Sequence, residues 1–441
     1  MHTSRRNFLK TSAAAATALS FPAILRAQNP NSLLQIAVVG ANGQGFSDLT
    51  QLGSHARVKF AGFCDVDTAR LDKADAKFPG TPQFQDFREM FAKLGDGFDA
   101  VLVATPDHMH AFIALDAMRR GKHVYCEKPL THTVWEARQM RLQAAKSKVV
   151  TQMGNQIHSA SEYRTAVQLI RDGAIGKITA VHAWQSNAGN NCTHLTEPPA
   201  PGTAPASLNW DAWLGTAPAR EFAPDVYHPF KWRDWQDFGG GTLGDFGCHI
   251  LDPVFTALEL TAPLSVRAEN AGLNSHTWPT AETVSYVFPA TAWTAGKTLP
   301  LTWYDGGRKP DRALAQLPEG EKLPGSGSLM IGEGGTLLLP HVGKPRLFPE
   351  EKFAAFEVKK IPGVSHYHAW VDAVLAGTKT TDGFDYAGPL TETVQLGNVA
   401  TRFPGETLEW NAADFRVPNK PEAERLLTKA YREGWKIEPV A

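Results

Sequence analysis

Short apolar runs alternate with amphipathic stretches through the part of the chain that follows residue 33. Five of these runs, at 34–39, 58–64, 100–104, 122–126 and 149–152, have the length of a strand. Continuous apolar runs are typical of strands buried on both faces, and the helical stretches between them supply the crossovers that parallel strands need. The pattern therefore predicts an α/β domain over residues 31–155, built on a doubly wound parallel sheet.

The pattern changes beyond residue 155. Segments 178–184, 264–268 and 283–288 alternate partly between apolar and polar residues, which predicts a mainly antiparallel, open sheet. Residues 187–240 are rich in Pro, Gly, Asn and Trp and are expected to form loops. The segment 366–402 has a helical pattern, with a turn expected at 383–389. Since 441 residues exceed one compact core, we expect a second, α+β domain over 156–441, with C-terminal helices available to pack on the first domain.

The N-terminus has the features of an export signal. Arg5 and Arg6 are followed by Phe8 and then by an alanine-rich, weakly apolar stretch at 11–25. This arrangement resembles a twin-arginine (Tat) signal peptide, so residues 1–30 are expected to direct export, with cleavage near Ala27. No later run reaches the ~18 apolar residues that a membrane span needs. We therefore expect a soluble exported protein, periplasmic in a cell with two membranes, that has no membrane partner.

Charge and cysteine content narrow the range of functions. The chain has 44 Lys and Arg against 45 Asp and Glu, which gives no basic face and argues against nucleic acid as a partner. Its four cysteines form no CxxC pair, so buried free thiols are expected; export keeps a disulfide open as an alternative. His194 and the segment His366–His368 have no carboxylate or thiol at ligand spacing. They are interpreted as solvated loop histidines, and no metal site is predicted.

A glycine-rich turn follows the first predicted strand and precedes a helical pattern. Such a turn brings backbone N–H groups and a helix N-terminus to a pyrophosphate, as in the Rossmann fold. Asn42 stands where the second glycine of G-x-G-x-x-G usually lies, and asparagine tolerates left-handed backbone. Asp65 ends the second strand, 65 − 45 = 20 residues after the last glycine, where a carboxylate binds ribose hydroxyls. We expect NAD, with NADP as the alternative, and the predicted contacts are Gly40, Asn42, Gly43, Gln44, Gly45 and Asp65.

Two further motifs lie at strand ends. The turn Thr105–His110 follows the third strand, and Glu127-Lys128-Pro129 follows the fourth. Together they resemble the Gfo/Idh/MocA family of oxidoreductases, and the resemblance continues through 209–215 and 239–249. It implies an NAD(P)-dependent dehydrogenase that forms a dimer or tetramer through its second domain. The cofactor contacts that it implies are Thr105, Pro106, His108, His110, Glu127 and Lys128.

The same resemblance places Lys128 at the reacting hydroxyl, where an ammonium favours alkoxide character. Asp245 and His249 are spaced i, i+4, so on a helix they share one face. The resemblance implies that His249 is the general base and that Asp245 orients the substrate; a simple pair on a helix surface is the alternative. Histidine suits this role because it titrates near neutral pH. Other candidates for a substrate pocket are Gln156, His158, Tyr163, Arg164, Trp232 and Arg233.

The expected reaction is hydride transfer from a secondary hydroxyl of a sugar, glycoside or cyclitol to the nicotinamide. One alternative is a glycosidase or lyase that oxidises its substrate only transiently, as some members of the family do. Another is a non-catalytic cofactor-binding partner of a different oxidoreductase. Because NAD is scarce outside the cytoplasm, an exported enzyme is expected to load its cofactor before export and to hold it tightly.

Overall fold

The first sheet of the protein is parallel throughout. The computed structural model describes residues 33–186 and 192–440, and the sheet has the order β3-β2-β1-β4-β5-β6. Its strands are β1 (Leu34–Val39), β2 (Val58–Cys64), β3 (Gln83–Phe84), β4 (Ala100–Val103), β5 (His123–Glu127) and β6 (Thr151–Gly154). The order reverses between β1 and β4, which is the arrangement of a doubly wound sheet. The predicted sheet is confirmed, with the addition of β3, which is too short to give a periodic signal.

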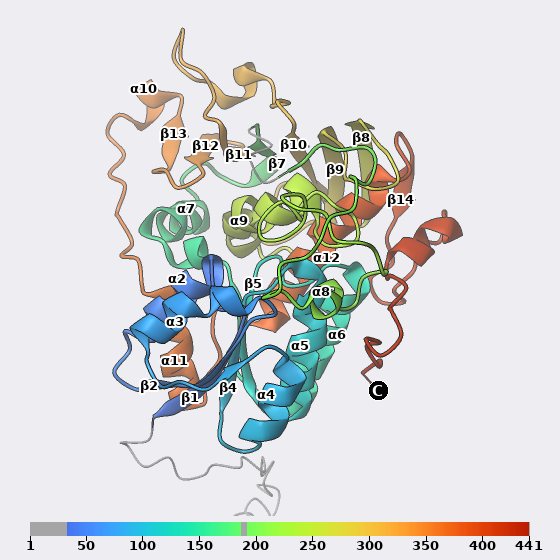
Figure 1. Ribbon diagram of the computed structural model, residues 1–441. Helices are drawn as coiled ribbons and strands as arrows, with labels where there is room; N and C mark the ends of the chain where they lie inside the picture. The colour runs from blue at the N-terminus through green and yellow to red at the C-terminus, as the bar shows by residue number, and fades with distance from the viewer. Residues whose placement is uncertain (1–32, 187–191, 441) are drawn as a thin grey trace, which may run out of the picture. The chain divides into compact units, whose positions relative to one another are not determined.

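Both faces of this sheet are apolar, because side chains of successive strand residues point to opposite faces. In β1, Ile36 and Val38 belong to one apolar cluster, whereas Ala37 and Val39 belong to another. The helices and the 3-10 turn that connect the strands are α2 (Gln44–Leu52), η1 (Thr68–Arg70), α3 (Asp72–Lys77), α4 (Phe87–Leu94), α5 (Asp107–Arg119) and α6 (Val134–Ser147). A later helix, α11 (His366–Ala376), packs beside α2, and its Trp370 joins the first of these clusters (Figure 1).

The second sheet has eight strands in the order β13-β12-β11-β7-β10-β9-β8-β14. Only β7 and β10 pair in parallel, and every other neighbouring pair is antiparallel. This result confirms the mainly antiparallel sheet. The strands are β7 (Ile178–Gln185), β8 (Ser265–Ala271), β9 (Ala281–Pro289), β10 (Thr298–Asp305), β11 (Ser326–Gly332), β12 (Gly335–Pro340), β13 (Arg346–Phe348) and β14 (Thr407–Glu409).

Two long helices, α9 (Gly241–Leu258) and α12 (Phe384–Thr401), pack against each other and against both halves of the fold (Figure 1). α9 contacts β7 and β11, while α12 contacts α6 and β8. One apolar cluster runs from Val39 of the first sheet through Val254 of α9 to Trp303 of the second sheet. The remaining helical elements are η2 (Gln156–Ser159), α7 (Ser161–Arg171), α8 (Trp210–Leu214), η3 (Arg312–Ala315), α10 (Glu350–Phe353) and η4 (Pro421–Leu426).

The helical segment predicted over 366–402 is present, but its turn lies elsewhere. The break falls between the end of α11 and the start of α12, at residues 377–383, and Pro389 lies inside α12. Within 192–240 the chain is mostly loop, as expected, apart from α8; residues 187–191 lie outside the described part.

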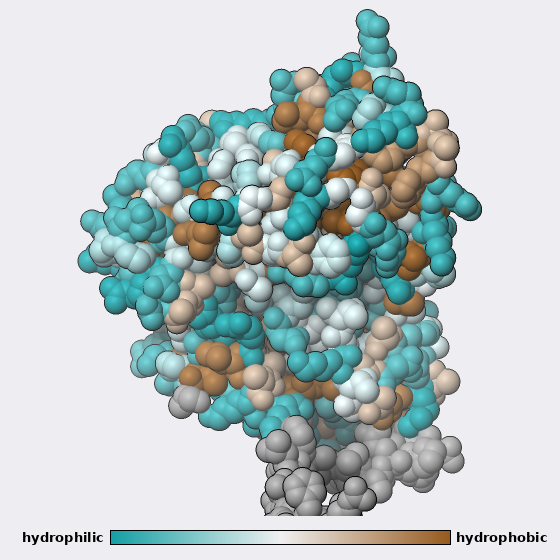
Figure 2. Space-filling model, turned by 180° about the vertical axis from the view of Figure 1, so that it is seen from behind, coloured by the Kyte–Doolittle hydropathy of each residue, from teal (hydrophilic) through white to brown (hydrophobic). Residues whose placement is uncertain are grey.

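The face seen in Figure 2 is mostly hydrophilic, with apolar side chains in scattered groups. In the part of the chain that the structure describes, no helix combines the length and the apolar character that a membrane crossing requires.

Candidate active site

A cavity of about 540 Å³ opens at the carboxyl ends of the parallel strands, where β1 and β4 reverse the strand order. Ligands of doubly wound sheets bind at this edge. Residues of β1, β2 and β5 meet residues of α9 and of the 228–233 loop around the same space. The predicted site residues that line it are Gly40, Asn42, Gly43, Gln44, Asp65, Thr105, Pro106, Glu127, Lys128, Asp245 and His249.

The glycine-rich turn has its left-handed residues at two glycines. Gly40 has φ 87° and Gly43 has φ 57°, whereas Asn42 does not adopt a positive φ. The expectation that Asn42 supplies a left-handed residue is therefore wrong; Gly43, one position later, supplies it. Gly45 does not line the cavity, but a Cβ there would lie 2.0 Å from the carbonyl oxygen of Gly40. Only glycine allows α2 to begin this close to the turn.

Asp65 is fixed at the cavity wall by two backbone groups. Its Oδ2 accepts the N–H of Ala41 at 3.1 Å, and its Oδ1 accepts the N–H of Asp67 at 3.1 Å. An ionised carboxylate offers about four acceptor positions, so about two remain for the vicinal hydroxyls of a ribose. Burial raises the pKa of Asp65 above its usual range. Arg70 also lines the cavity, five residues further along the chain.

Glu127 is held inside the wall by a side-chain network. Gln156 Nε2 donates to Glu127 Oε1 at 2.6 Å, and Glu127 is only 5% exposed. Burial raises the pKa of Glu127 strongly, and the nearby Asp48 adds to the rise. Asp48 in turn accepts hydrogen bonds from Gln44 Nε2 at 2.7 Å and from the Tyr367 hydroxyl at 2.8 Å. These contacts bind the cavity wall to α2 and to α11.

Lys128 and Asp245 form an ion pair inside the cavity. Lys128 Nζ lies 2.5 Å from Asp245 Oδ1 and 2.9 Å from the Asp245 backbone oxygen. Arg233 Nε lies 3.3 Å from the same Oδ1. Asp107 is buried beside these groups, accepts the N–H of Gly240 at 3.2 Å, and has its pKa raised to about 7, mainly by burial. An ammonium has three donors, so Lys128 keeps one for a substrate oxygen.

His249 lies one turn after Asp245 on α9, as the i, i+4 spacing predicts. Its Nδ1 hydrogen-bonds to Asn155 Oδ1, and the amide nitrogen of Asn155 donates to the Cys248 carbonyl at 3.1 Å. Because the amide oxygen accepts, Nδ1 carries the hydrogen and Nε2 keeps a lone pair. No described residue hydrogen-bonds to Nε2. Burial lowers the pKa of His249 well below its usual range, and Lys128 and His341 lower it further. The ring is therefore a neutral acceptor.

Two predicted cofactor contacts lie elsewhere. His108 and His110 are buried outside the cavity lining. His108 Nε2 bonds to the Trp213 carbonyl at 3.0 Å, and His110 bonds to the carbonyls of Pro129 and Thr105 at 2.9 and 2.8 Å. Both rings thus lie outside the cavity lining; backbone oxygens contact both nitrogens of His110 but only Nε2 of His108, whose buried Nδ1 has no partner among the described residues. Their contact with the cofactor stays a prediction. The cavity-lining residues that the sequence did not single out include Arg70, Asp107 and Trp435.

The other candidates divide in the same way. Gln156, Trp232 and Arg233 line the cavity, whereas His158, Tyr163 and Arg164 do not. His194 is an exposed loop residue. The prediction of a solvated loop is wrong for His366, which lies on α11 at 4% exposure with its ring between Ser159 Oγ and the Met153 carbonyl.

The four cysteines are free, and three of them are buried. This confirms the predicted free thiols. The expectation of burial fails at one position only, because Cys192 is half-buried.

Two domains of one protein family match this chain. Residues 34–155 match the oxidoreductase family with an NAD-binding Rossmann fold, and residues 175–289 match the C-terminal alpha/beta domain of the same family. Residues 2–22 match the twin-arginine translocation signal sequence.

Individual relatives are similar over part of the chain. An inositol 2-dehydrogenase of Arthrobacter sp. (strain FB24) is 32% identical over 158 residues, which is 35% of this chain and 46% of that protein. A glycosyl hydrolase family 109 protein of Shewanella sp. (strain ANA-3) is 27% identical over 155 residues, which is 33% of each. The chain thus spans less than half the length of these curated relatives.

The WlbA dehydrogenase from Bordetella pertussis, solved with NADH and UDP-GlcNAcA, has the same fold. It superposes with a TM-score of 0.59 at 17% identity, over 86% of this chain and 99% of that one.

The fold thus joins an NAD-binding Rossmann domain to a mainly antiparallel sheet, with a cavity at the carboxyl ends of the parallel strands. The chain belongs to the Gfo/Idh/MocA family and carries a Tat signal sequence.

Proposed function

We propose that this protein is an NAD-dependent dehydrogenase that acts on a secondary hydroxyl of a sugar, glycoside or cyclitol. The observation that carries the proposal is the pairing of a neutral His249, whose Nε2 lone pair is unused, with an ammonium at Lys128 in one cavity. A base and a cation around one hydroxyl are what alcohol oxidation requires. The inositol dehydrogenase relative supports the substrate class.

The residues present fit a nicotinamide dinucleotide. The left-handed Gly40 and Gly43 bring backbone N–H groups and the start of α2 to the cavity, where a pyrophosphate would lie. Asp65 keeps about two acceptor positions for the adenosine ribose, and its charge favours NAD over NADP. When bound, the nicotinamide accepts the hydride at C4.

The side chains of the cavity accept and release the proton of the substrate hydroxyl. His249 Nε2 takes the proton of the substrate hydroxyl, while the third donor of Lys128 stabilises the negative charge that develops on the oxygen. Asp245 holds Lys128 in place through two contacts on the first turns of α9. Since Lys128 and burial both disfavour a charged His249, the ring releases this proton readily once the hydride has left.

The division of the chain follows from these roles. We propose that residues 31–155 hold the cofactor and that residues 156–441 supply the substrate pocket and the contacts of a dimer or tetramer. Light scattering on the purified protein tests the assembly, because a monomer at micromolar concentration would contradict it.

Export adds a second candidate function. The signal at residues 2–22 matches a pathway that carries folded proteins, and we propose that the protein leaves the cytoplasm with its dinucleotide already bound. An enzyme that keeps its cofactor must regenerate it in place. This favours transient oxidation coupled to hydrolysis or elimination, and the glycosyl hydrolase relative supports that alternative.

One experiment separates the two functions. The protein is purified without added cofactor, denatured, and its released dinucleotide is measured by chromatography; a glycoside and cyclitol panel is then followed by NADH absorbance and mass spectrometry. Net NADH formation supports the dehydrogenase, and product formation without NADH supports transient oxidation. Absence of turnover across the panel contradicts both and indicates a cofactor-binding partner of another enzyme.

A further inference from the structure

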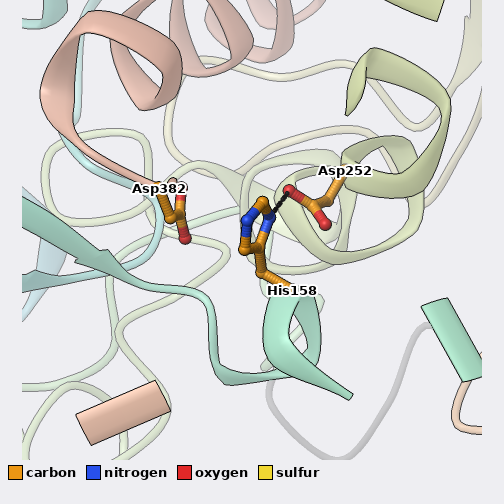
Figure 3. Close-up of side chains that lie close together, drawn as sticks. All are labelled: His158, Asp252 and Asp382. Carbon is orange, nitrogen blue, oxygen red and sulfur yellow. Dashed lines mark hydrogen bonds and ion pairs between the residues drawn. The ribbon is translucent and has the colours of Figure 1, made fainter. Parts of the chain in front are cut away.

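A second cluster of titratable side chains lies outside the cavity lining. His158 is on η2, Asp252 is on α9, and Asp382 is in the turn that precedes α12 (Figure 3). Each offers one donor atom, and these atoms all lie within 4.8 Å of one another. His158 Nδ1 and Asp252 Oδ1 are 2.9 Å apart. Three segments that are distant in sequence thus converge on one point.

The carboxylate of Asp382 has no hydrogen-bond partner in this cluster. Its side chain is 1% exposed, and neither carboxylate oxygen has a hydrogen-bond partner. In Figure 3 its carboxylate lies beside the imidazole of His158. A buried carboxyl group without partners is costly, and nearly all buried polar groups in proteins have one. A ligand that contacts Asp382 would remove this cost.

The turn that carries Asp382 is held in position before any ligand binds. The Met153 N–H donates to the Asp382 carbonyl at 2.9 Å, and the Phe384 N–H donates to Thr151 Oγ1 at 3.0 Å. Both bonds attach the turn to β6. The backbone at Asp382 is therefore held next to β6 by these two contacts.

Asp252 is oriented in a similar way. The Tyr386 hydroxyl donates to Asp252 Oδ1 at 2.7 Å and lies 3.0 Å from the Asp252 carbonyl. Metal ligands are commonly oriented by such hydrogen bonds from outside the coordination shell. Thr381 is exposed, and its hydroxyl lies 3.0 Å from His158 Nε2, so the imidazole contacts a residue that reaches solvent. An ion and its water ligands have a short entry path there.

We propose that His158, Asp252 and Asp382 form a binding site for a divalent transition-metal ion of the Mn²⁺ or Zn²⁺ class. One imidazole nitrogen and two carboxylates are a mixed N/O donor set, which such ions accept and Ca²⁺ or Mg²⁺ seldom use. With a neutral imidazole, the two carboxylates balance the charge of the ion. Neighbouring ligands at ~2.1 Å from a metal are about 3.0–3.4 Å apart, so an ion could replace the hydrogen bond of 2.9 Å between His158 Nδ1 and Asp252 Oδ1 with only a small shift of the two side chains.

A metal ion at this site would stabilise the contact between α9 and η2 next to the active site. Asp252 follows Asp245 and His249 on α9, and His158 follows Asn155, the hydrogen-bond partner of His249. An ion between His158 and Asp252 would fix α9 against η2 and so fix the position of the base. This inference concerns a site that the proposed dehydrogenase activity does not use, and it can be tested without a substrate.

The test compares two substitutions of the same kind on the full-length, tag-free protein. Asp382→Asn removes one proposed ligand at nearly constant volume, whereas Asp385→Asn makes the same change at an exposed residue paired with Lys379. Each protein is treated with EDTA, dialysed, and titrated with MnCl₂ or ZnCl₂ by calorimetry, with bound metal measured by mass spectrometry. Wild type and Asp385→Asn should bind about one ion per chain, and Asp382→Asn should bind at least ~10-fold more weakly.

Thermal unfolding gives a second readout. At ~100 times the dissociation constant the metal should raise the Tm of wild type by about 3–5 °C, with no rise in Asp382→Asn. His158→Gln should behave as Asp382→Asn does, and it preserves the test if that variant fails to fold. Equal metal binding by wild type, His158→Gln and Asp382→Asn would overturn the proposal. So would the absence of any stoichiometric binding to wild type, which would leave an imidazolium at His158 as the counter-charge of Asp382.

Discussion

The proposed role of the Asp65 carboxylate in selecting NAD over NADP gives a prediction that can be measured. Two of its about four acceptor positions are occupied by the N–H groups of Ala41 and Asp67. The proposed role assigns the remaining positions to the two hydroxyls of the adenosine ribose. A hydrogen bond to a charged group contributes about 1.5–3 kcal/mol. Asp65→Ser should therefore raise the Kd for NAD by about 10- to 150-fold.

The affinity for NADP should move the other way. The carboxylate repels a 2′-phosphate, and the nearby Arg70 attracts one, so removing the carboxylate leaves a net attraction. We expect the ratio of the NADP Kd to the NAD Kd to fall by at least ~10-fold. The assay is calorimetric titration of each cofactor into protein that has first been freed of bound dinucleotide.

A matched control lies at the opposite edge of the same sheet. Asp99 accepts the Gln35 N–H at 2.9 Å just before β4 begins, so Asp99→Ser removes a similar carboxylate–backbone bond away from the cavity. It should leave the cofactor ratio unchanged. If Asp65→Ser and Asp99→Ser gave the same ratio, Asp65 would not lie at the ribose.

The pH dependence of NAD binding provides an independent check. Burial raises the pKa of Asp65, and in the proposed role only the ionised form accepts hydrogen bonds from both ribose hydroxyls. Affinity is therefore complete above this pKa and is lost as pH falls through it, earlier than for an ordinary aspartate. NAD binding by Asp65→Ser should not depend on pH in this range. If the pH dependence persisted in the variant, it would belong to another titratable group.

Three other changes test the remaining parts of the site. Lys128→Met and His249→Gln should each lower turnover by ~10²–10⁴-fold while NAD still binds; near-normal turnover on an identified substrate would contradict their roles. Asn155→Asp places a negative charge beside His249 Nδ1 and raises the pKa of the ring, so kcat/KM should fall on the acid side of neutrality, where wild type stays flat; superimposable pH profiles would refute this. Gly45→Ala brings a Cβ to 2.0 Å from the Gly40 carbonyl oxygen and should abolish NAD binding and lower Tm; unchanged calorimetry would show that the turn can move.

The first sheet could be predicted closely, because its strands are continuous apolar runs. β1 and β2 have the predicted bounds, and both faces of the sheet are buried. Fewer strands of the second sheet could be predicted from the sequence. β10 alternates between exposed and buried residues but contains Pro300, which is typical of a strand end, and β11 and β12 are joined through adjacent glycines.

The site was predictable only where a motif defines it. Asp245 and His249 share one side of α9, as their spacing indicates, and Lys128 lies in the same cavity, as the family resemblance implies. In contrast, the burial of His108 depends on Trp213 and Phe238, which are more than 100 residues away. His366 is likewise buried because Ser159 and the Met153 carbonyl satisfy its ring. Local sequence carries no record of partners that only the tertiary fold supplies.

The late arrival of the chain's last segments has a consequence for biosynthesis. Trp370 covers one face of the first sheet, and Trp435 completes the wall of the cavity. Between residues 155 and 370 a ribosome must add 370 − 155 = 215 residues, which takes about 10–40 s at ~5–20 residues per second. During that time the dinucleotide domain is exposed on the side that α11 will cover. Capture of the proposed cofactor would therefore follow translation of residue 435, and export of the loaded protein would follow capture.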